Sequence, residues 1–257
     1  MAQSIAQNIY DTPEFFKNYL KLPRQVKGLG GSPEWPRMHA LLPPKIDGFH
    51  ILDVGCGLGW FCRWAADNGA TSVCGVDLSQ NMLERAKSLA MNGKYEVIKY
   101  VRTDLEAFNP EGLGLGKEPY DLIFSSLTLH YLTNLPDVVA KIQAMLKPGG
   151  DFVFSVEHPI RTAPINPGVQ LDESTGKKYW PLSNYQVEGE RVTNWLADGV
   201  RKQHRTIGTY VAILLGAGFA LTGLDEWYPT EEQLAAQPVW ADASVRPEFM
   251  LVRATKL

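Results

Sequence analysis

A glycine-rich loop near the start of the chain contains the residues best able to contact a ligand through their backbone. It runs from Gly55 to Gly59, follows the apolar run His50–Val54, and has glycine at every second position. Glycine lets the backbone approach a ligand closely and adopt a positive φ. Between a strand and a helix, such a loop lies at the carboxyl edge of a parallel sheet, where ligands bind. The spacing alone is weak evidence, because many tight turns use glycine only for packing.

A carboxylate after the next apolar run strengthens the prediction. Asp77 lies about 20 residues beyond the loop, where a carboxylate can accept hydrogen bonds from ribose hydroxyls. Nicotinamide-binding folds share this feature, but their loop reads Gly-x-Gly-x-x-Gly. Counted from Gly55, that third glycine would fall on Trp60, whereas the glycine here is Gly59. The loop therefore disfavours a nicotinamide dinucleotide.

Candidate acid–base groups follow two later apolar runs. Glu157 and His158 end one run, and His130 follows the run before it. A positioned carboxylate or imidazole can accept a proton in a transition state, so all three are catalytic candidates. The alternatives are a structural hydrogen bond to the turn at Pro159 for His158, and a capping or ligand-pocket role for His130. No grouping of side chains has metal-ligand spacing, so we expect no metal.

The apolar runs predict the elements that position these residues. Seven runs have the pattern of strands, at residues 50–54, 72–76, 95–101, 120–124, 151–156, 219–227 and 248–254. Helical patterns separate them at residues 60–68, 80–90, 135–146 and 206–215, and another covers 13–20. Strands that alternate with helices imply right-handed crossovers and a parallel sheet covered on both faces. The sequence therefore predicts an α/β fold with a Rossmann-like arrangement.

We expect one domain, residues 1–257, with four parts. Residues 1–48 form an N-terminal lid or substrate segment, 49–158 the cofactor-binding core, 159–205 an insertion over the active site, and 206–257 complete the sheet. The insertion is polar, and a hairpin over Tyr185–Trp195 is expected to turn near Gly189. Aromatic residues in the lid and the insertion could line a pocket for a planar or apolar molecule. The candidate substrate residues are Trp35, Tyr131, Trp180 and His204.

Bulk properties narrow the classes of partner. The 257 residues include 25 Lys and Arg against 28 Asp and Glu, a net charge of −3, which does not favour nucleic-acid binding. Three cysteines, Cys56, Cys62 and Cys74, fit neither a disulfide framework nor a zinc site. No run approaches the roughly 20 apolar residues of a membrane helix, and the first residues show no secretory signal. We expect a cytoplasmic protein without membrane or nucleic-acid partners, and the oligomeric state stays open.

In order along the chain, the motifs resemble those of class I S-adenosylmethionine-dependent methyltransferases of the small-molecule type. The matching segments are Ile51–Gly59, Val76–Ser79, Asp104–Leu105, Tyr120–Tyr131 and Leu146–Gly150. The match is strong over residues 50–157 and moderate over residues 204–257. It implies a seven-stranded, mostly parallel sheet with helices on both faces and an antiparallel last strand. It also implies S-adenosylmethionine as the cofactor.

The resemblance assigns roles to individual residues. Gly55 and Gly57 would contact the methionyl part, Asp53 would order the loop and the amino group, and Asp77 would bind the ribose. Ser125 and Ser126, in the matching segment Tyr120–Tyr131, would lie near the sulfonium. The alternative is that they end a buried strand and that their hydroxyls are hydrogen-bonded within the protein. Together, the candidate cofactor residues are Asp53, Gly55, Gly57, Gly59, Asp77, Leu78, Asp104, Leu105, Ser125, Ser126, Tyr19 and Arg24.

The sequence thus predicts transfer of a methyl group to an O or N atom of a small, aromatic or apolar molecule, with secondary metabolism as one setting. The segment Ser125–His130 lacks the Asn/Asp-Pro-Pro-Tyr pattern associated with methylation of base and glutamine amino groups. One alternative is an S-adenosylmethionine-binding protein without methyl transfer, either regulatory or a cofactor-assisted pericyclase or isomerase. The other, disfavoured by Trp60, is an NAD(P)-dependent oxidoreductase.

Overall fold

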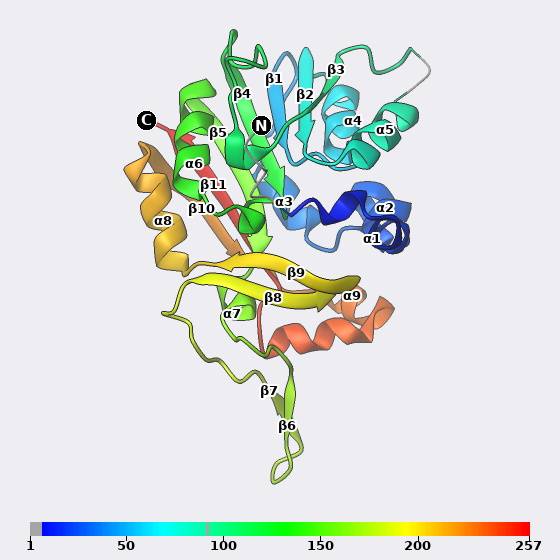
Figure 1. The fold of residues 1–257 in the computed structure, drawn as a ribbon, viewed down its shortest axis with the longest axis vertical. Helices are drawn as coiled ribbons and strands as arrows, with labels where there is room; N and C mark the ends of the chain where they lie inside the picture. The colour runs from blue at the N-terminus through cyan, green and yellow to red at the C-terminus, as the bar shows by residue number, and fades with distance from the viewer. Residues whose placement is uncertain (1–6, 91–92) are drawn as a thin grey trace.

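A seven-stranded sheet forms the centre of the computed structural model, which describes residues 7–90 and 93–257 (Figure 1). The first residues, Met1–Ser4, which we expect not to form a secretory signal, lie outside these ranges. The strand order is β10-β11-β5-β4-β1-β2-β3. The strands are β1 (His50–Val54), β2 (Ser72–Asp77), β3 (Ile98–Arg102), β4 (Tyr120–Ser126), β5 (Leu146–Glu157), β10 (Phe219–Glu226) and β11 (Phe249–Lys256).

Strands β1 to β5 run parallel, and β11 pairs antiparallel with both β5 and β10. The predicted sheet with its antiparallel last strand is therefore confirmed. Two strand starts differ from the prediction by three residues or more. Strand β3 begins at Ile98 because residues 93–97 form turns, and β5 begins at Leu146 because that residue already pairs with Tyr120.

Helices cover both faces of the sheet, as predicted for parallel strands. Helices α6 (Leu135–Met145) and α8 (Ile207–Gly216) contribute to a core with Leu52 and Ile123. The opposite face carries α3 (Trp35–Leu41) and α4 (Trp60–Asp67), which pack with Ile51 and Leu122, and Leu83 from α5 (Gln80–Leu89) joins them. Because successive strand residues point to opposite faces, one strand supplies both cores. Helix α3 was not predicted.

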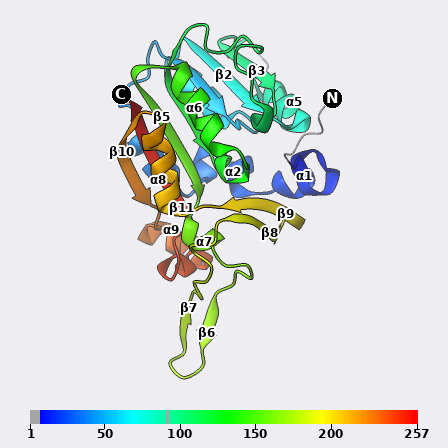
Figure 2. The ribbon, with the colours of Figure 1, turned by 60° about the vertical axis from the view of Figure 1, so that its left-hand side comes forward.

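Two segments lie beyond the carboxyl ends of the parallel strands (Figures 1 and 2). One is the N-terminal segment, with η1 (Ile9–Asp11), α1 (Pro13–Tyr19), α2 (Pro23–Val26) and η2 (Gly28–Gly31). The other is the insertion, with α7 (Pro159–Thr162), β6 (Gln170–Asp172), β7 (Lys177–Tyr179), β8 (Gly189–Trp195) and β9 (Ala197–His204). Helices α9 (Glu231–Ala236) and η5 (Pro238–Ser244) lie beside it, and η3 (Leu105–Ala107) and η4 (Leu129–Tyr131) follow β3 and β4.

The predicted position of the hairpin in the insertion is wrong. Strands β8 and β9 turn at Leu196, which has a φ of 59°, whereas Gly189 begins β8 and pairs with His204. A left-handed leucine costs about 1–2 kcal/mol, which is why sequence reasoning places such a turn at glycine. Here Leu196 and Trp195 pack against the cluster around Phe15, a tertiary contact that offsets the cost. A second hairpin, β6–β7, projects from the molecule and was not predicted (Figure 2).

None of the helices in the described ranges is long and apolar enough to cross a membrane.

A buried carboxylate ties the antiparallel strand to the parallel sheet. Asp151 on β5 accepts hydrogen bonds from Arg253 Nε at 3.0 Å and Nη2 at 2.8 Å, and from Thr255 Oγ1 at 2.7 Å. Its side chain is only 8% exposed. Its loss would leave the partly buried guanidinium of Arg253 without its partner.

We expect Asp151→Ala to lower the free energy of unfolding by about 3 kcal/mol, because removal of the carboxylate leaves the Arg253 guanidinium without its ion-pair partner. Urea unfolding would measure this. Asp137→Ala is the control, because it breaks an exposed pair with Lys141 and should cost less than about 1 kcal/mol. Equal losses in the two variants would contradict the role of Asp151.

Candidate cofactor and substrate site

A cavity of about 590 Å³ lies at the carboxyl ends of the strands, beneath the N-terminal segment and the β8–β9 hairpin. We call it the main cavity. Its glycine-loop end is lined by residues after β1, β2 and β3, and its β5 end by residues after β4 and β5 and by the insertion. Nine predicted cofactor residues line the main cavity: Tyr19, Arg24, Gly55, Gly57, Asp77, Leu78, Asp104, Leu105 and Ser126.

The glycine loop is held by the carboxylate at the end of β2. Asp77 Oδ2 accepts a hydrogen bond from the Gly57 amide at 2.9 Å, and Oδ1 accepts one from Ser79 at 2.8 Å. Gly57 has a φ of 50°, and a Cβ there would have no atom within 4 Å, so open space lies over it. Gly55 has a packing role as well, because its Cβ would lie 2.1 Å from Thr128 Oγ1. The loop therefore needs glycine and leaves room for a ligand.

Three predicted cofactor residues support the loop from below and do not line the cavity. Asp53 is buried and accepts from Cys62 Sγ at 3.2 Å. Burial raises the pKa of Asp53 to about 7, although the Cys62 hydrogen bond opposes the rise. Gly59 precedes α4 with a φ of 69°, where a Cβ would lie 2.1 Å from the Tyr100 hydroxyl. Ser125 is buried and donates to a carbonyl of β1, which agrees with its alternative structural role.

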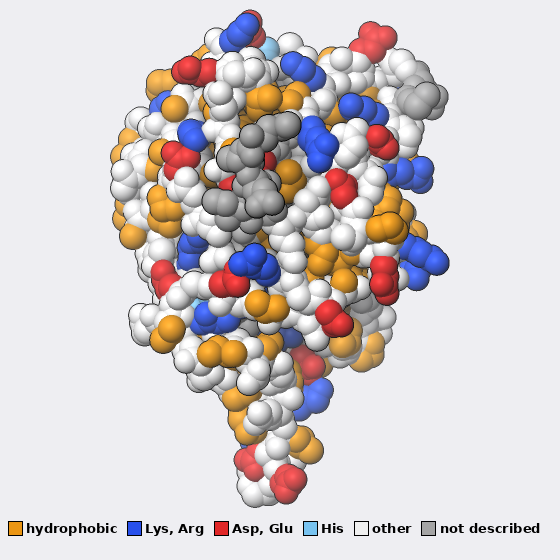
Figure 3. Space-filling view, viewed as in Figure 1, with side chains coloured by type: hydrophobic (Ala, Val, Ile, Leu, Met, Phe, Trp, Pro, Cys, Tyr) orange, Lys and Arg blue, Asp and Glu red, His pale blue; other side chains and the backbone are white. Residues whose placement is uncertain are grey.

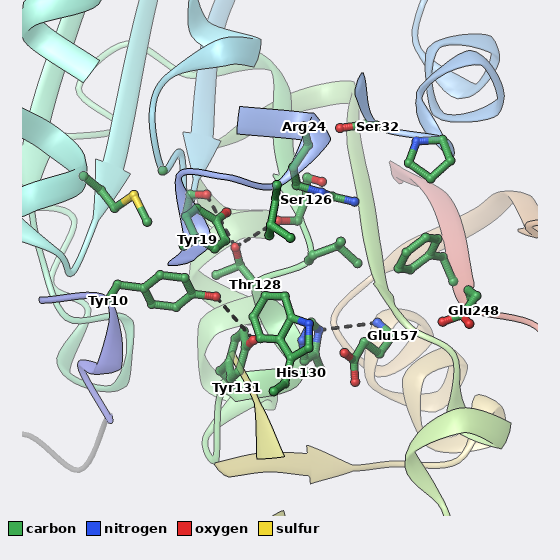
Figure 4. A pocket seen from close by; sticks show the side chains of 18 of the residues that line it. Tyr10, Tyr19, Arg24, Ser32, Ser126, Thr128, His130, Tyr131, Glu157 and Glu248 are labelled. Atoms are coloured by element: carbon green, nitrogen blue, oxygen red, sulfur yellow. Dashed lines mark hydrogen bonds between the residues drawn. The ribbon is translucent and has the colours of Figure 1, made fainter. Parts of the chain in front are cut away.

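The N-terminal segment brings a cation and a phenol to the glycine-loop end (Figure 4). Arg24 Nη2 pairs with Glu34 Oε1 at 2.9 Å, and the Glu34 side chain is only 3% exposed. Burial raises the pKa of Tyr19 to about 12, so its hydroxyl stays protonated. The pair leaves Arg24 ordered and facing the cavity, where it can contact a carboxylate.

Asp11 anchors this segment and was missed by the sequence analysis. Its carboxylate accepts from Ser79 Oγ and from the backbone amides of Gln80 and Asn81, at the N-terminus of α5. An acidic side chain is favourable there because the amides at a helix start lack partners. The lid is thus attached beside Asp77. No local pattern predicts this contact, because Asp11 and α5 lie far apart in the sequence.

The β5 end contains two of the three catalytic candidates, Glu157 and His130 (Figure 4). Burial raises the pKa of Glu157, but Arg161 and Lys202 outweigh that effect and hold it at about 2. Lys202 Nζ lies 2.6 Å from Glu157 Oε1. Glu157 is therefore ionised at neutral pH.

Burial lowers the pKa of His130 to about 3, so the ring is neutral. Its Nδ1 accepts from the Glu157 backbone amide at 3.4 Å. A neutral imidazole that accepts at Nδ1 carries its proton on Nε2. His130 is therefore a hydrogen-bond donor in this arrangement.

His158 is fully buried outside the main cavity. Its Nε2 lies 2.8 Å from Glu226 Oε1, and its Nδ1 accepts from the Ile160 amide, which caps α7. Both ring nitrogens are thus used, and this placement favours the structural alternative over catalysis.

The candidate substrate residues are divided between two locations. Trp35 and Tyr131 line the main cavity, and Tyr131 accepts a hydrogen bond from the Tyr10 hydroxyl at 3.3 Å. Trp180 lines a neighbouring cavity instead. His204 lines neither cavity, because its ring lies between Thr162 Oγ1 and the Tyr185 carbonyl.

Several residues that line the main cavity were not among the predicted site residues. They lie on or next to α7, β8, β9, η5 and β11, and they include Arg161, Trp195, Gln203, Trp240, Glu248 and Phe249. Within the described ranges, no three or more His, Cys, Asp or Glu side chains form a group able to hold a metal ion. The main cavity therefore combines a glycine loop with an aromatic and ionic far end.

Known proteins share this arrangement. A family model described as a methyltransferase domain matches residues 52–154. The crystal structure of an S-adenosylmethionine-dependent methyltransferase from Mesorhizobium loti is 44% identical, covers 89% of this chain and 100% of that one, and has a TM-score of 0.82. A Listeria monocytogenes protein proposed to have the same activity is 36% identical over 88% of this chain and 99% of its own, with a TM-score of 0.76.

A more distant relative is a malonyl-[acyl-carrier protein] O-methyltransferase from Enterobacter lignolyticus. It is 34% identical over 105 residues, which are 41% of this chain and 38% of that protein. This match covers less than half of the chain, whereas the Mesorhizobium loti match covers most of it. On this evidence the chain belongs to the S-adenosylmethionine-dependent methyltransferase family and is an enzyme of that class.

Proposed function

We propose that this methyltransferase acts on an oxygen or nitrogen atom of a small molecule bound at the β5 end of the main cavity. The observation that carries the proposal is the enclosure of that end by the chain's own lid and insertion. A volume of about 590 Å³ is shared between cofactor and acceptor, within the roughly 300–1,000 Å³ typical of small-molecule sites. On the face in Figure 3, basic and acidic side chains of the described residues are interspersed, as is usual without a nucleic-acid partner.

The residues of the glycine-loop end fit the cofactor. S-adenosylmethionine supplies a methyl group on a sulfonium, which needs no further activation. Asp77 would accept from the ribose hydroxyls, Asp104 would contact the adenine, and the open space over Gly57 would take the methionyl part. Arg24 would bind its carboxylate, with Tyr19 beside it. The buried carboxylate of Asp53 lies beneath the loop and favours a cation above it.

The β5 end can orient the acceptor. Ionised Glu157 can accept a hydrogen bond from an O–H or N–H group, and His130 can donate one from Nε2. With a pKa of about 2, Glu157 is a weak base. We therefore assign it to alignment, which is the main requirement of an in-line transfer. Trp35, Tyr131 and neighbouring rings would hold an apolar or aromatic part of the acceptor.

A screen tests the proposed function. Purified protein would be incubated with S-adenosylmethionine and a metabolite library, and release of S-adenosylhomocysteine would be followed. We expect small molecules with a hydroxyl or amino group to be methylated, and the product's mass to rise by one methylene. If only carrier-protein-bound, protein or nucleic-acid acceptors were methylated, the proposal would fail.

The raised pKa of Asp53 predicts pH-dependent cofactor binding. Below about pH 7 this carboxyl is protonated, and a cationic ligand favours its ionised form. Binding should therefore release a proton, and affinity should rise about threefold to tenfold from pH 6 to 7.5, since one linked proton changes affinity at most tenfold per pH unit.

Isothermal titration calorimetry in buffers of different ionisation enthalpy would measure both effects. Asp53→Asn should flatten the profile relative to wild type, and Asp137→Asn on α6 should not. If the affinity for the cofactor depended on pH in the same way in the wild type and in Asp53→Asn, Asp53 would be excluded as the titrating group.

Glu157 and His158 should differ in what their substitution changes. We expect Glu157→Gln to lower kcat/KM at least about tenfold with an unchanged cofactor Kd, because it weakens alignment of the acceptor. His158→Ala should instead lower the free energy of unfolding by about 2 kcal/mol, because it removes the cap of α7 and the hydrogen bond to Glu226. Steady-state kinetics and urea unfolding would compare them. The reverse pattern would restore His158 as the catalytic group.

A further inference from the structure

A second cavity of about 340 Å³ adjoins the β5 end of the main cavity. Both cavities are lined by Glu157, Arg161 and Trp195, which lie where the two adjoin. The second cavity lies among α7, the β8–β9 hairpin and the residues after η5. The proposed methyl transfer does not use it, yet it lies next to the place where the acceptor would bind.

Ion pairs bind part of its wall together. Glu157 lies 2.6 Å from Lys202 Nζ and 3.8 Å from Arg161 Nε. Arg161 and Arg246 both pair with Glu248, whose side chain is 8% exposed. These three cations therefore share two carboxylates. One positive charge is left in excess.

A fourth cation increases the imbalance. Arg191 lines the same cavity, is 8% exposed, and makes no ion pair with a carboxylate of the described residues. Its guanidinium donates to backbone carbonyls, those of Ala163, Asn184, Val187 and Glu190. The remaining lining carboxylate, Asp242, is held by Lys178 at 2.6 Å, so that pair is neutral. Together, the charges leave an excess of two positive charges.

Two polar groups lining the second cavity are also unsatisfied. Arg246 Nε and Thr193 Oγ1 are buried and have no hydrogen-bond partner among the described residues. The Arg246 guanidinium lies 4.9 Å from the centre of the Trp180 ring, which fixes its plane. Burial and, after it, the charge of Arg161 lower the pKa of Arg246 to about 10, as expected for a cation without full compensation. A buried donor without a partner is costly, so a missing acceptor fits both atoms.

We propose that the second cavity binds the anionic group of the acceptor, a carboxylate or a phosphate, through Arg246 and Thr193. This inference rests on the proposed function and narrows its substrate class to anionic small molecules. A planar guanidinium that is already oriented matches either oxyanion, and the excess positive charge favours it. The rest of the acceptor extends past Arg161 and Trp195, so its reacting atom faces Glu157 and His130. The ionic wall then sets the length of the acceptor.

Anion binding can be tested without an acceptor. Inorganic phosphate and malonate would be titrated into the full chain by calorimetry at constant ionic strength, with chloride as the reference. We expect at least one of them to bind more tightly than chloride, and the tighter of the two identifies the oxyanion. Equal behaviour of phosphate, malonate and chloride would overturn the proposal.

Substitutions locate the site. Arg246→Gln should weaken binding of the tighter anion about tenfold or more, as expected for loss of a charged hydrogen bond. Thr193→Val, of similar volume, should weaken it about threefold to tenfold. Arg37→Gln is the control, because that arginine is 47% exposed in a pair with Asp225 and lines neither cavity. If Arg246→Gln folds and binds the anion as tightly as the wild type, the assignment is contradicted. If Arg246→Gln does not fold, unchanged anion affinity in Thr193→Val would contradict it instead.

Turnover separates this inference from the proposed function. With an anionic acceptor from the screen, Arg246→Gln should raise KM far more than it lowers kcat and leave the cofactor Kd unchanged. Neutral acceptors turned over as well as anionic ones would overturn the anion site but keep the methyltransferase. A screen without any small-molecule product would instead contradict the proposed function, and the phosphate and malonate titrations would still report on the site.

Discussion

The hydrogen bonds of Asp77 to Gly57 and Ser79 join the glycine loop to the start of α5, and the site depends on them. Strands β1 and β2 are parallel neighbours, so their carboxyl ends meet and the loop after β1 lies over the end of β2. The Gly55 amide donates to the Val76 carbonyl at 2.8 Å, which closes the same junction. Asp11 then attaches the lid to Ser79. Asp77 thus shapes the loop and holds the start of α5, and Asp11 attaches the lid to that start.

The two ends of the cavity system have opposite electrostatic character. At the glycine-loop end, burial raises the pKa of Asp53 and Asp77, and the charge of a neighbouring carboxylate adds to the rise in each case. At the β5 end, Arg161 and Lys202 hold Glu157 ionised, and an excess of positive charge continues into the second cavity. A cationic cofactor and an anionic acceptor would each enter the region that its charge favours. This division follows from the chain's own residues.

The lid and the insertion do more than exclude water. Phe15 and Trp195 pack edge to face at 5.7 Å, so the two segments contact each other above the strands. Rings from both segments line the cavity between them. Each segment is anchored separately: Asp11 holds the lid at the start of α5, and the Lys202–Glu157 ion pair holds the hairpin at the end of β5.

The sequence by itself determined the α/β fold, the sheet with its antiparallel last strand, and the cofactor class. The α/β fold follows from local patterns of apolar runs, whereas the antiparallel last strand and the cofactor class follow from the resemblance of the ordered motifs to a known family. It could not separate lining residues from supporting ones, because Gly57 and Gly59 share a motif and only packing against Tyr100 distinguishes them. The tertiary structure alone decided that His158 is buried and contacts Glu226, that the hairpin turns at Leu196, and that three cations share two carboxylates next to Arg191. Those outcomes arise from contacts between residues distant in sequence, and no local pattern encodes which partner a charged or aromatic side chain will meet.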